Sequence, residues 1–263
     1  FQDMFINYIP ALTKQHTYNL MATLYPYATQ PLGEIGFQGD VVYKIKKGTA
    51  LGGKYGTSIN VNYSFASNID TTALGDVNQG EARQGYSSNM FKMGRRANGD
   101  IDQYFGDFNV EISRKLNKTY KLRAVYQNLL YRQELLEGKP GAGDVHADIV
   151  VLDLLAKINR KQSIRTELQG LFTEDHLGDW ATVLVEYTYA PHYFVSFMNQ
   201  WNYGNPVEDE RLQFPILSAG YIKDATRITL SYGRQREGIF CVGGVCRVVP
   251  ASNGLNISVT TRY

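Results

Sequence analysis

The side chains best suited to acid–base catalysis are the four histidines, His16, His146, His176 and His192. His146 and Asp148 are two residues apart and would lie on one face of a strand. A membrane hydrolase of the Ser/His/Asn type also needs a serine within hydrogen-bond reach of the imidazole, and no spacing here predicts one. The other three histidines are expected at the surface, in turns or a short loop. Common catalytic and phosphate-binding motifs are absent from the sequence, so we expect no enzyme activity, no cofactor and no metal site.

The two cysteines, Cys241 and Cys246, enclose the sequence Val-Gly-Gly-Val. Gly243 and Gly244 can supply a tight hairpin turn that brings the thiols together. A metal site needs more ligands at closer spacing, and a redox dithiol more often has the spacing Cys-x-x-Cys. In an oxidising compartment the pair is therefore expected to form a disulfide that stiffens the tip of the loop.

Arginines near this hairpin are candidates for contacts with an anionic partner. Arg234, Arg236 and Arg247 could bind the phosphates of lipopolysaccharide or an acidic protein. The alternative is a solvated rim with one or two ion pairs to Glu237.

The longest expected loop, residues 67–102, contains the apolar group Met90, Phe91 and Met93. An apolar group in a loop suggests docking against another surface. The loop could fold into a barrel as a constriction, cap the barrel or contact another protein, and the alternative is a free, flexible loop. These three residues are therefore candidate loop contacts.

Alternation of apolar and polar residues is the strongest structural signal in the chain. In residues 34–45, Phe37 and Val41 would lie on one face of a strand, and Asp40 and Lys44 on the other. Most of the predicted strands are longer than the five or six residues usual in soluble sheets, and when tilted they are long enough to cross a bilayer. The alternation and the turn signals together predict thirteen strands, at 2–10, 17–26, 34–45, 56–66, 103–116, 119–132, 145–158, 162–173, 180–190, 192–203, 212–223, 226–236 and 253–263.

The connections between these strands are expected to alternate between short and long, as in outer-membrane barrels with short periplasmic turns and long external loops. The segment 46–55 fits this pattern least well, because a short turn is due there. Residues 255–263 alternate up to the aromatic Tyr263, which resembles the C-terminal recognition strand of outer-membrane proteins. Because bacterial single-chain barrels have an even number of strands, we expect at least one strand before Phe1, unless one strand is miscounted.

Each predicted strand has an apolar face for lipid and a polar face for the barrel interior. The interior charges include Glu111, Arg123, Arg165, Glu167 and Glu186. Hairpin geometry would place Glu111 opposite or diagonal to Arg123, and Arg165 diagonal to Glu186. These charges either brace the interior through salt bridges or line a conduit that selects solutes. The lipid-facing set comprises Ile59, Val61, Tyr63, Phe65, Phe108, Val110, Ile112, Ile164, Leu168, Phe172, Val183, Val185, Tyr187, Tyr189, Ile228, Leu230 and Tyr232.

One predicted strand, 145–158, is apolar on both faces. Ile149 and Val151 would lie on one face, and Val150 and Leu152 on the other. We therefore expect the inner face of this strand to pack against a plug or another apolar element, or against neighbouring side chains.

The composition is typical of a membrane barrel. Aromatic residues make up 13% of the chain, with 19 tyrosines, while the mean hydropathy is −0.30. Tyrosines gather where a ring meets apolar surroundings and its hydroxyl meets water. A formal net charge of +2 without basic runs gives no reason to expect nucleic acid. The uniform texture favours one domain, 1–263, and the alternative is a soluble, tyrosine-rich β-sandwich.

Three segments of the chain, 7–20, 24–31 and 232–254, resemble a family of Bacteroidota outer-membrane proteins of unknown function. The resemblance covers the full chain. Members of that family are longer at the N-terminus, which implies that this chain is the C-terminal part of a longer protein. The resemblance implies no activity, so no functional residue follows from it.

We therefore expect an all-β protein, a transmembrane antiparallel up-and-down β-barrel with about 13 strands in this chain and 14 or more in the complete protein. Its expected function is that of a non-enzymatic channel, or of a structural or partner-binding component of an envelope complex, in the bacterial outer membrane. Its expected partners are outer-membrane lipid, lipopolysaccharide and, in the second case, other envelope proteins. The alternative is a membrane-embedded hydrolase that acts on lipid or lipopolysaccharide.

Overall fold

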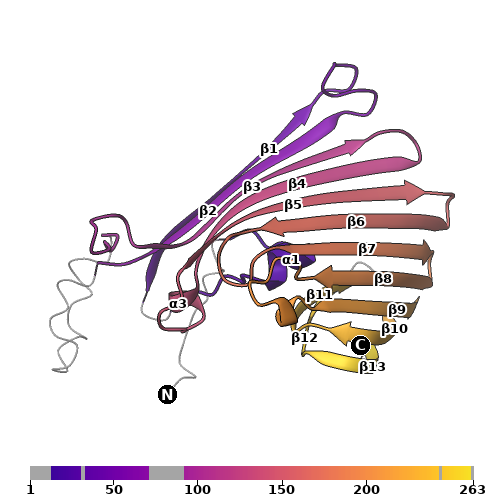
Figure 1. Cartoon of the computed structure of the whole chain (residues 1–263). Coiled ribbons are helices and arrows are strands. Elements are labelled where there is room, and N and C mark those ends of the chain that lie inside the picture. The colour runs from indigo at the N-terminus through magenta and orange to yellow at the C-terminus, as the bar shows by residue number, and fades with distance from the viewer. Residues whose placement is uncertain (1–12, 31–32, 71–91, 243–244, 262–263) are drawn as a thin grey trace.

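The structure is a computed structural model that describes residues 13–30, 33–70, 92–242 and 245–261. Within them, one antiparallel sheet of eleven strands dominates the molecule (Figure 1). Successive strands are neighbours throughout, except that β13 follows β10 directly. The strands of the sheet are β1 (Glu34–Ile45), β2 (Thr57–Asn68), β3 (Gln103–Lys115), β4 (Tyr120–Arg132), β5 (Asp144–Lys157), β6 (Gln162–Phe172), β7 (Trp180–Tyr189), β8 (Tyr193–Trp201), β9 (Gln213–Lys223), β10 (Thr226–Gln235) and β13 (Ser252–Thr261).

The predicted all-β, up-and-down architecture is confirmed. Each strand from β1 to β9 continues into its neighbour in the sheet, and the tight turns at 116–119, 158–161, 190–192 and 224–225 all lie at one end. The longer connections 133–143, 173–179 and 202–212 lie at the other end, which we call the long-loop end, as do the described residues 69–70 and 92–102 between β2 and β3. The first connection, 46–56, is the long exception that the sequence indicated. In the described residues, β1 and β13 are the two edges of the sheet.

The predicted alternation between two faces is present in the sheet. In β8, Val195 is 47% exposed, whereas the next residue, Ser196, is 2% exposed. In β6, Leu168 is 50% exposed and Glu167 is 2% exposed. Phe65 is an exception among the residues predicted to face lipid, because Phe37 stacks on it with a ring-centroid distance of 5.4 Å and leaves it buried. The outer face is therefore apolar and exposed, and the inner face is mostly polar and covered.

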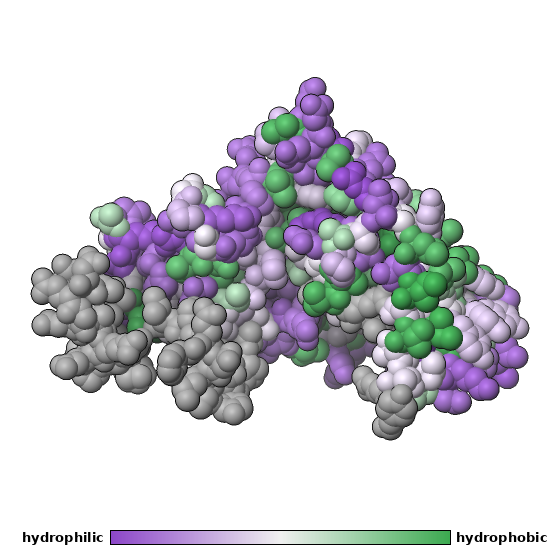
Figure 2. Space-filling view, turned by 90° about the horizontal axis from the view of Figure 1, so that it is seen from below, coloured by the Kyte–Doolittle hydropathy of each residue, from purple (hydrophilic) through white to green (hydrophobic). Residues whose placement is uncertain are grey.

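Exposed apolar side chains continue across the outer face of the last strands. Leu230, Leu255, Ile257 and Val259 are all exposed there. Figure 2, which views the molecule from below, shows hydrophobic residues gathered on its right-hand side, the side on which Figure 1 places β13. A surface of this kind needs an apolar environment.

The prediction of a strand at 17–26 is wrong. Residues Asn19–Thr23 form a short helix, α1, and consecutive residues from Tyr18 to Ala22 are all buried. A strand at the surface of a barrel exposes every second residue, whereas a segment surrounded by other elements is buried on all sides. The apolar residues in this run are therefore explained by burial and not by a strand with one exposed face. The predicted strand at 2–10 lies outside the described residues.

Two further short helices lie in loops, α3 (Gln133–Leu136) and the 3-10 helix η3 (Glu208–Glu210). None of the helices in the described residues has the length and apolarity needed to cross a membrane. Between β10 and β13, the chain forms a separate two-stranded hairpin, β11 (Gly238–Val242) and β12 (Val245–Val249). Its register places Cys241 opposite Cys246, which agrees with the predicted hairpin. The disulfide itself stays a prediction.

The main apolar core lies between the helix α1 region and the inner face of the sheet. Val145, Ile149 and Val151 of β5 are at most 1% exposed and belong to one cluster with Leu20 and Leu24. This contact explains why β5 is apolar on both faces, since its inner face packs against the polypeptide in front of it. The expectation of an apolar element inside the barrel is therefore met by the residues around α1.

We predict that Ile149→Ala lowers the free energy of unfolding by about 2–5 kcal/mol, because it leaves a cavity in this core. Val150→Ala is the matched control, since Val150 is the next residue and faces outward with 40% exposure. Its loss should be smaller, because mobile lipid chains can fill the space. Urea unfolding in lipid vesicles, followed by tryptophan fluorescence, measures both values. Equal losses for the two variants would contradict this assignment of the faces.

Candidate functional site

Residues 13–30, which we call the internal segment, lie against the inner face of the sheet. Their side chains contact residues of β2, β3, β4, β5, β6 and β8, so the segment crosses most of the sheet (Figure 1). The segment then reaches the long-loop end, where β1 begins at Glu34. Polar side chains of the inner face hold this segment, and the contacts between the two define the candidate site.

The first group of contacts surrounds Lys14 and His16. The Lys14 ammonium donates hydrogen bonds to Asn60 Oδ1 at 3.2 Å and Asn109 Oδ1 at 3.0 Å. His16 Nε2 lies 2.6 Å from Asp107 Oδ2 and 3.2 Å from Gln127 Nε2. The Asp107 side chain is 1% exposed, so its contact with the His16 imidazole takes the place of contacts with water.

The second group of contacts fixes α1. The backbone N–H of Leu20 donates to Gln169 Oε1 at 2.8 Å, and the Tyr18 hydroxyl donates to Asp153 Oδ2 at 3.2 Å. Both acceptors belong to inward-facing side chains of the sheet. Burial of the hydroxyl is the main cause that raises the pKa of Tyr18 above its ordinary value, so the hydroxyl remains a donor.

The predicted interior charges face inward and take part in these contacts. Arg165 forms ion pairs with Asp153, at 3.1 Å, and with Glu167, and Glu167 accepts a further hydrogen bond from Gln169. Glu111 lies 3.1 Å from Arg123 in the diagonal arrangement expected from the hairpin.

The expected relation between Arg165 and Glu186 is different in the structure. The register places them directly opposite each other rather than diagonally, and the ion pairs of Arg165 go to Asp153 and Glu167. The carboxylates of Asp153 on β5 and Glu167 on β6 therefore hold the guanidinium. Glu186 is a buried inward-facing residue at 7% exposure.

The internal segment leaves the interior through a cluster of tyrosines. Tyr27 and Tyr104 both donate hydrogen bonds to the Glu34 carboxylate, and the backbone N–H of Gln30 donates to it at 3.0 Å. Burial and then the hydrogen bond to Glu34 raise the pKa of Tyr27. The first residue of β1 therefore fixes the end of the segment.

Tyr25 closes the same end of the interior. Its ring packs on Tyr131 at 5.2 Å and on His176 at 6.0 Å between centroids. Burial raises the pKa of Tyr25 and lowers the pKa of His176, so both side chains remain neutral at pH 7. His176 Nε2 also lies 2.9 Å from Gln133 Nε2 of α3.

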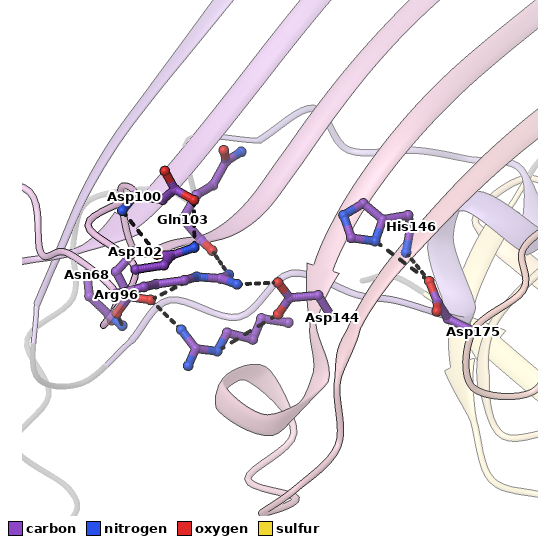
Figure 3. A network of polar contacts seen from close by, with 10 residues as sticks. Asn68, Arg96, Asp100, Asp102, Gln103, Asp144, His146 and Asp175 are labelled. Atoms are coloured by element: carbon purple, nitrogen blue, oxygen red, sulfur yellow. Dashed lines mark hydrogen bonds and ion pairs between the residues drawn. The ribbon is translucent and has the colours of Figure 1, made fainter.

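A network of charges ties the β2–β3 loop to the long-loop end of the sheet (Figure 3). Arg96 lies 2.6 Å from Asp144 and 3.5 Å from Asp102, and Arg132 forms an ion pair with Asp102. The hydrogen bond to Asp144 raises the pKa of Arg96. Because the charges alternate in sign, the cluster holds residues 96–102 against the start of β5 and the end of β4.

The candidate loop contacts have mixed outcomes. Met93 is half-buried and pairs with Ile69 in an isolated β-bridge, whereas Met90 and Phe91 lie outside the described residues. Arg234 lies 4.9 Å from the ring of Phe214, and Arg236 lies 5.0 Å from the ring of Trp180.

The arginine cluster is therefore not simply a solvated rim. Burial lowers the pKa of Arg236, whose guanidinium lies against an aromatic ring that is itself buried. The Arg247 side chain lies outside the described residues, although its backbone belongs to β12. Binding of lipopolysaccharide phosphates by these arginines stays a prediction.

The expectation for His16 is wrong, because this residue lies in the interior and not in a surface turn. The reason is the error at 17–26, since a helix and not a strand follows His16. His146 Nδ1 lies 3.7 Å from Asp175, a loop residue (Figure 3). Asp148 instead accepts hydrogen bonds from Tyr126 and Asn128. His192 lies in the expected turn and contacts the backbone oxygen of Ile222 at 2.8 Å. No cluster of three potential metal ligands occurs among the described residues.

A cavity of about 470 Å³ lies between the internal segment and strands β3 and β4. Lys14, His16, Asp107 and Gln127 form its polar wall, and Met21, Tyr25, Phe105 and Leu129 contribute to its apolar wall. Sequence analysis missed Lys14 and His16 as interior residues, because their partners are distant in the chain. The apolar inner face of β5 was the one signal that pointed to an element in front of the sheet.

We predict that Gln169→Leu loosens the internal segment, because it leaves the buried N–H of Leu20 without its acceptor. A buried unsatisfied N–H costs about 1–3 kcal/mol, which corresponds to roughly 10- to 100-fold faster hydrogen exchange around α1. Hydrogen exchange read by mass spectrometry on peptides from residues 13–30 measures this effect. Gln213→Leu is the control, since Gln213 is exposed and contacts only the neighbouring strand. Unchanged exchange in Gln169→Leu would show that this hydrogen bond does not hold the segment.

Comparison with known proteins gives a family but no established activity. No curated protein matches the chain. Among solved structures, the chain is similar to the crystal structure of a Pseudomonas aeruginosa FadL homologue, with 14% identity and a TM-score of 0.35 over 86% of this chain and 65% of that one. Values this low carry no functional assignment, and this chain spans less than two thirds of that protein's length. The model of the family of unknown function DUF6029 matches residues 1–263, so the chain belongs to this family.

Proposed function

We propose that this chain is a non-enzymatic β-barrel of the bacterial outer membrane, whose interior is closed by the internal segment and which acts as a structural or partner-binding component of an envelope assembly. The single observation that carries the proposal is the course of residues 13–30 across the inner face of the sheet. An open channel is the less favoured form of the same hypothesis, because this segment occupies the space that a solute would need.

The outer face of the sheet supports a membrane location. Its exposed residues include Phe108, Leu168, Val185 and Leu230, each from a different strand. Exposing such an apolar band to water would be unfavourable, whereas lipid chains provide an apolar environment for it. Aromatic residues near strand ends, such as Tyr120, Tyr189 and Tyr193, suit the interface between lipid and water.

The inner face supports a scaffold role. Polar contacts to three separate parts of the internal segment, at Lys14, Tyr18 and Leu20, come from β2, β3, β5 and β6. Such contacts hold the segment in one position more firmly than an apolar surface alone would. A partner would then bind to the long-loop end, where the end of β10 and residues 96–102 lie.

The remaining expectations belong to the same proposal. Outer-membrane lipid and lipopolysaccharide are the proposed surroundings, and a Bacteroidota source and a longer complete protein follow from the resemblance found in the sequence. The hydrolase alternative would depend on His146, which is 68% exposed at its side chain and lies beside Asp175. If His146→Ala changed the lipid composition of the membrane, the alternative would replace our proposal.

We predict that labels on the outer face contact lipid. Spin labels at Leu168→Cys and Leu230→Cys, in a background with Cys241→Ser and Cys246→Ser, should be relaxed more by oxygen than by a water-soluble nickel chelate. A label at Thr229→Cys is the matched control, because Thr229 precedes Leu230 and is buried on the inner face. If the nickel chelate relaxed the two outer labels more strongly than oxygen, the outer face would not lie in a bilayer.

We predict that the chain reconstituted in a planar bilayer passes no steady ionic current, because the internal segment closes the interior. The double variant Leu20→Asp/Leu24→Asp should give measurable conductance, because two buried charges in the apolar core displace the segment. Leu51→Asp is the control, since Leu51 is 72% exposed in the β1–β2 connection. A difference in gel migration between the unheated and the heated protein checks that each barrel has folded. Steady current through the unmodified chain would favour the channel form of the hypothesis.

A further inference from the structure

We infer that the cavity between the internal segment and strands β3 and β4 is a binding site for a small amphipathic anion. Its volume of about 470 Å³ falls within the range of about 300–1,000 Å³ usual for small-molecule sites. The site is built from two parts of the chain that are distant in sequence, residues 13–27 and residues 105–129. The inferred site would add a ligand to the proposed scaffold role, and the inference does not depend on that role.

The Lys14 ammonium gives the cavity its preference for an anion. An ammonium has three donors, and the two partners of Lys14 are the neutral amide oxygens of Asn60 and Asn109. In the described residues no carboxylate forms an ion pair with Lys14. The third donor and the uncompensated charge of this half-buried side chain therefore suit a carboxylate, sulfonate or phosphate of a ligand.

The acidic residues near Lys14 are already engaged through intervening amides. Asp107 receives the His16 contact at 2.6 Å and a hydrogen bond from Asn109 Nδ2 at 2.9 Å. Asp40 receives a hydrogen bond from Asn60 Nδ2, also at 2.9 Å. The amides of Asn60 and Asn109 therefore accept from Lys14 through their oxygens and donate to Asp40 and Asp107 through their nitrogens. This leaves the third donor of the ammonium available for a ligand.

A second polar group at the cavity wall is only partly satisfied. Gln127 is 1% exposed, and its Nε2 lies 3.2 Å from His16 Nε2. Its Oε1 is buried and has no hydrogen-bond partner among the described residues. An amide oxygen only accepts hydrogen bonds, so Gln127 adds nothing to the preference for an anion and would pair with a donor elsewhere on a ligand.

The rest of the cavity wall suits an apolar body. Met21, Phe105 and Leu129 are buried, and Tyr25 and Tyr27 add aromatic rings. A ligand with an aromatic or short alkyl body would therefore place its body against these side chains and its charge near Lys14. These two requirements together define an amphipathic anion as the ligand class.

The test uses 4-phenylbutyrate as the probe and 4-phenylbutylamine as its oppositely charged match, added to the full chain in lipid nanodiscs. Ligand-observed NMR titration, with empty nanodiscs subtracted, should give a dissociation constant on the order of 1 mM for the anion, and binding of the amine should be at least tenfold weaker. Lys14→Gln should weaken binding of the anion about tenfold, whereas Lys14→Arg should retain it. Lys47→Gln, in the exposed β1–β2 connection, should have no effect.

A second variant tests the site without changing its charge. Ala22→Phe would place a ring in the cavity, since Ala22 lines it, and should abolish binding of the anion. This variant also decides the matter if Lys14→Gln does not fold. The inference is overturned if the anion does not bind, if the amine binds equally well, or if binding persists unchanged in Ala22→Phe.

Discussion

The need to satisfy a polar inner face is the constraint on which the rest of this structure depends. Strands with an apolar outer face turn every other side chain inward, and in this chain many of those side chains are charged or carry amides. Asp107 and Glu167 are at most 2% exposed, so water alone does not solvate them. The internal segment supplies partners such as His16 for Asp107, and the sheet supplies others, such as Arg165 for Glu167 within β6. The segment is therefore part of the fold, because without it buried groups such as Asp107 would lose one of their partners.

The long-loop end solves a related problem with ion pairs instead of packing. Arg96 comes from a loop, whereas Asp144 begins β5 and Arg132 ends β4. Since these side chains are about a quarter exposed, water screens the attraction, and the network contributes more to positioning than to stability. Its effect is to hold one long loop against the rim of the sheet. The structure therefore has a defined rim at the long-loop end.

Sequence reasoning predicted the strands of the sheet well, because each is determined by a local alternation between an exposed apolar face and a covered polar face. The bounds predicted for β3, β4, β5 and β6 differ from those observed by one residue at most. The same rule failed at residues 17–26, where Tyr18 to Ala22 are all buried. There the apolar residues Leu20, Met21 and Leu24 pack in all directions, so their spacing carries no alternation. The pairs that hold the segment are separated by 46 residues, as in Lys14 with Asn60, to 179 residues, as in Asn19 with Met198, and leave no local pattern.

The sequence by itself determined the class of fold, the two faces of each strand, the alternation of short turns and long loops, and the likeness to a family of unknown function. Each of these depends on neighbours within one strand or one hairpin. Only the tertiary structure decided that residues 13–30 lie inside, that His16 meets Asp107 there, and that a cavity lined by Lys14 remains beside them. The physical reason is that these features arise where distant segments meet, and the contacts between them are set by the curvature of the sheet and the space that it encloses.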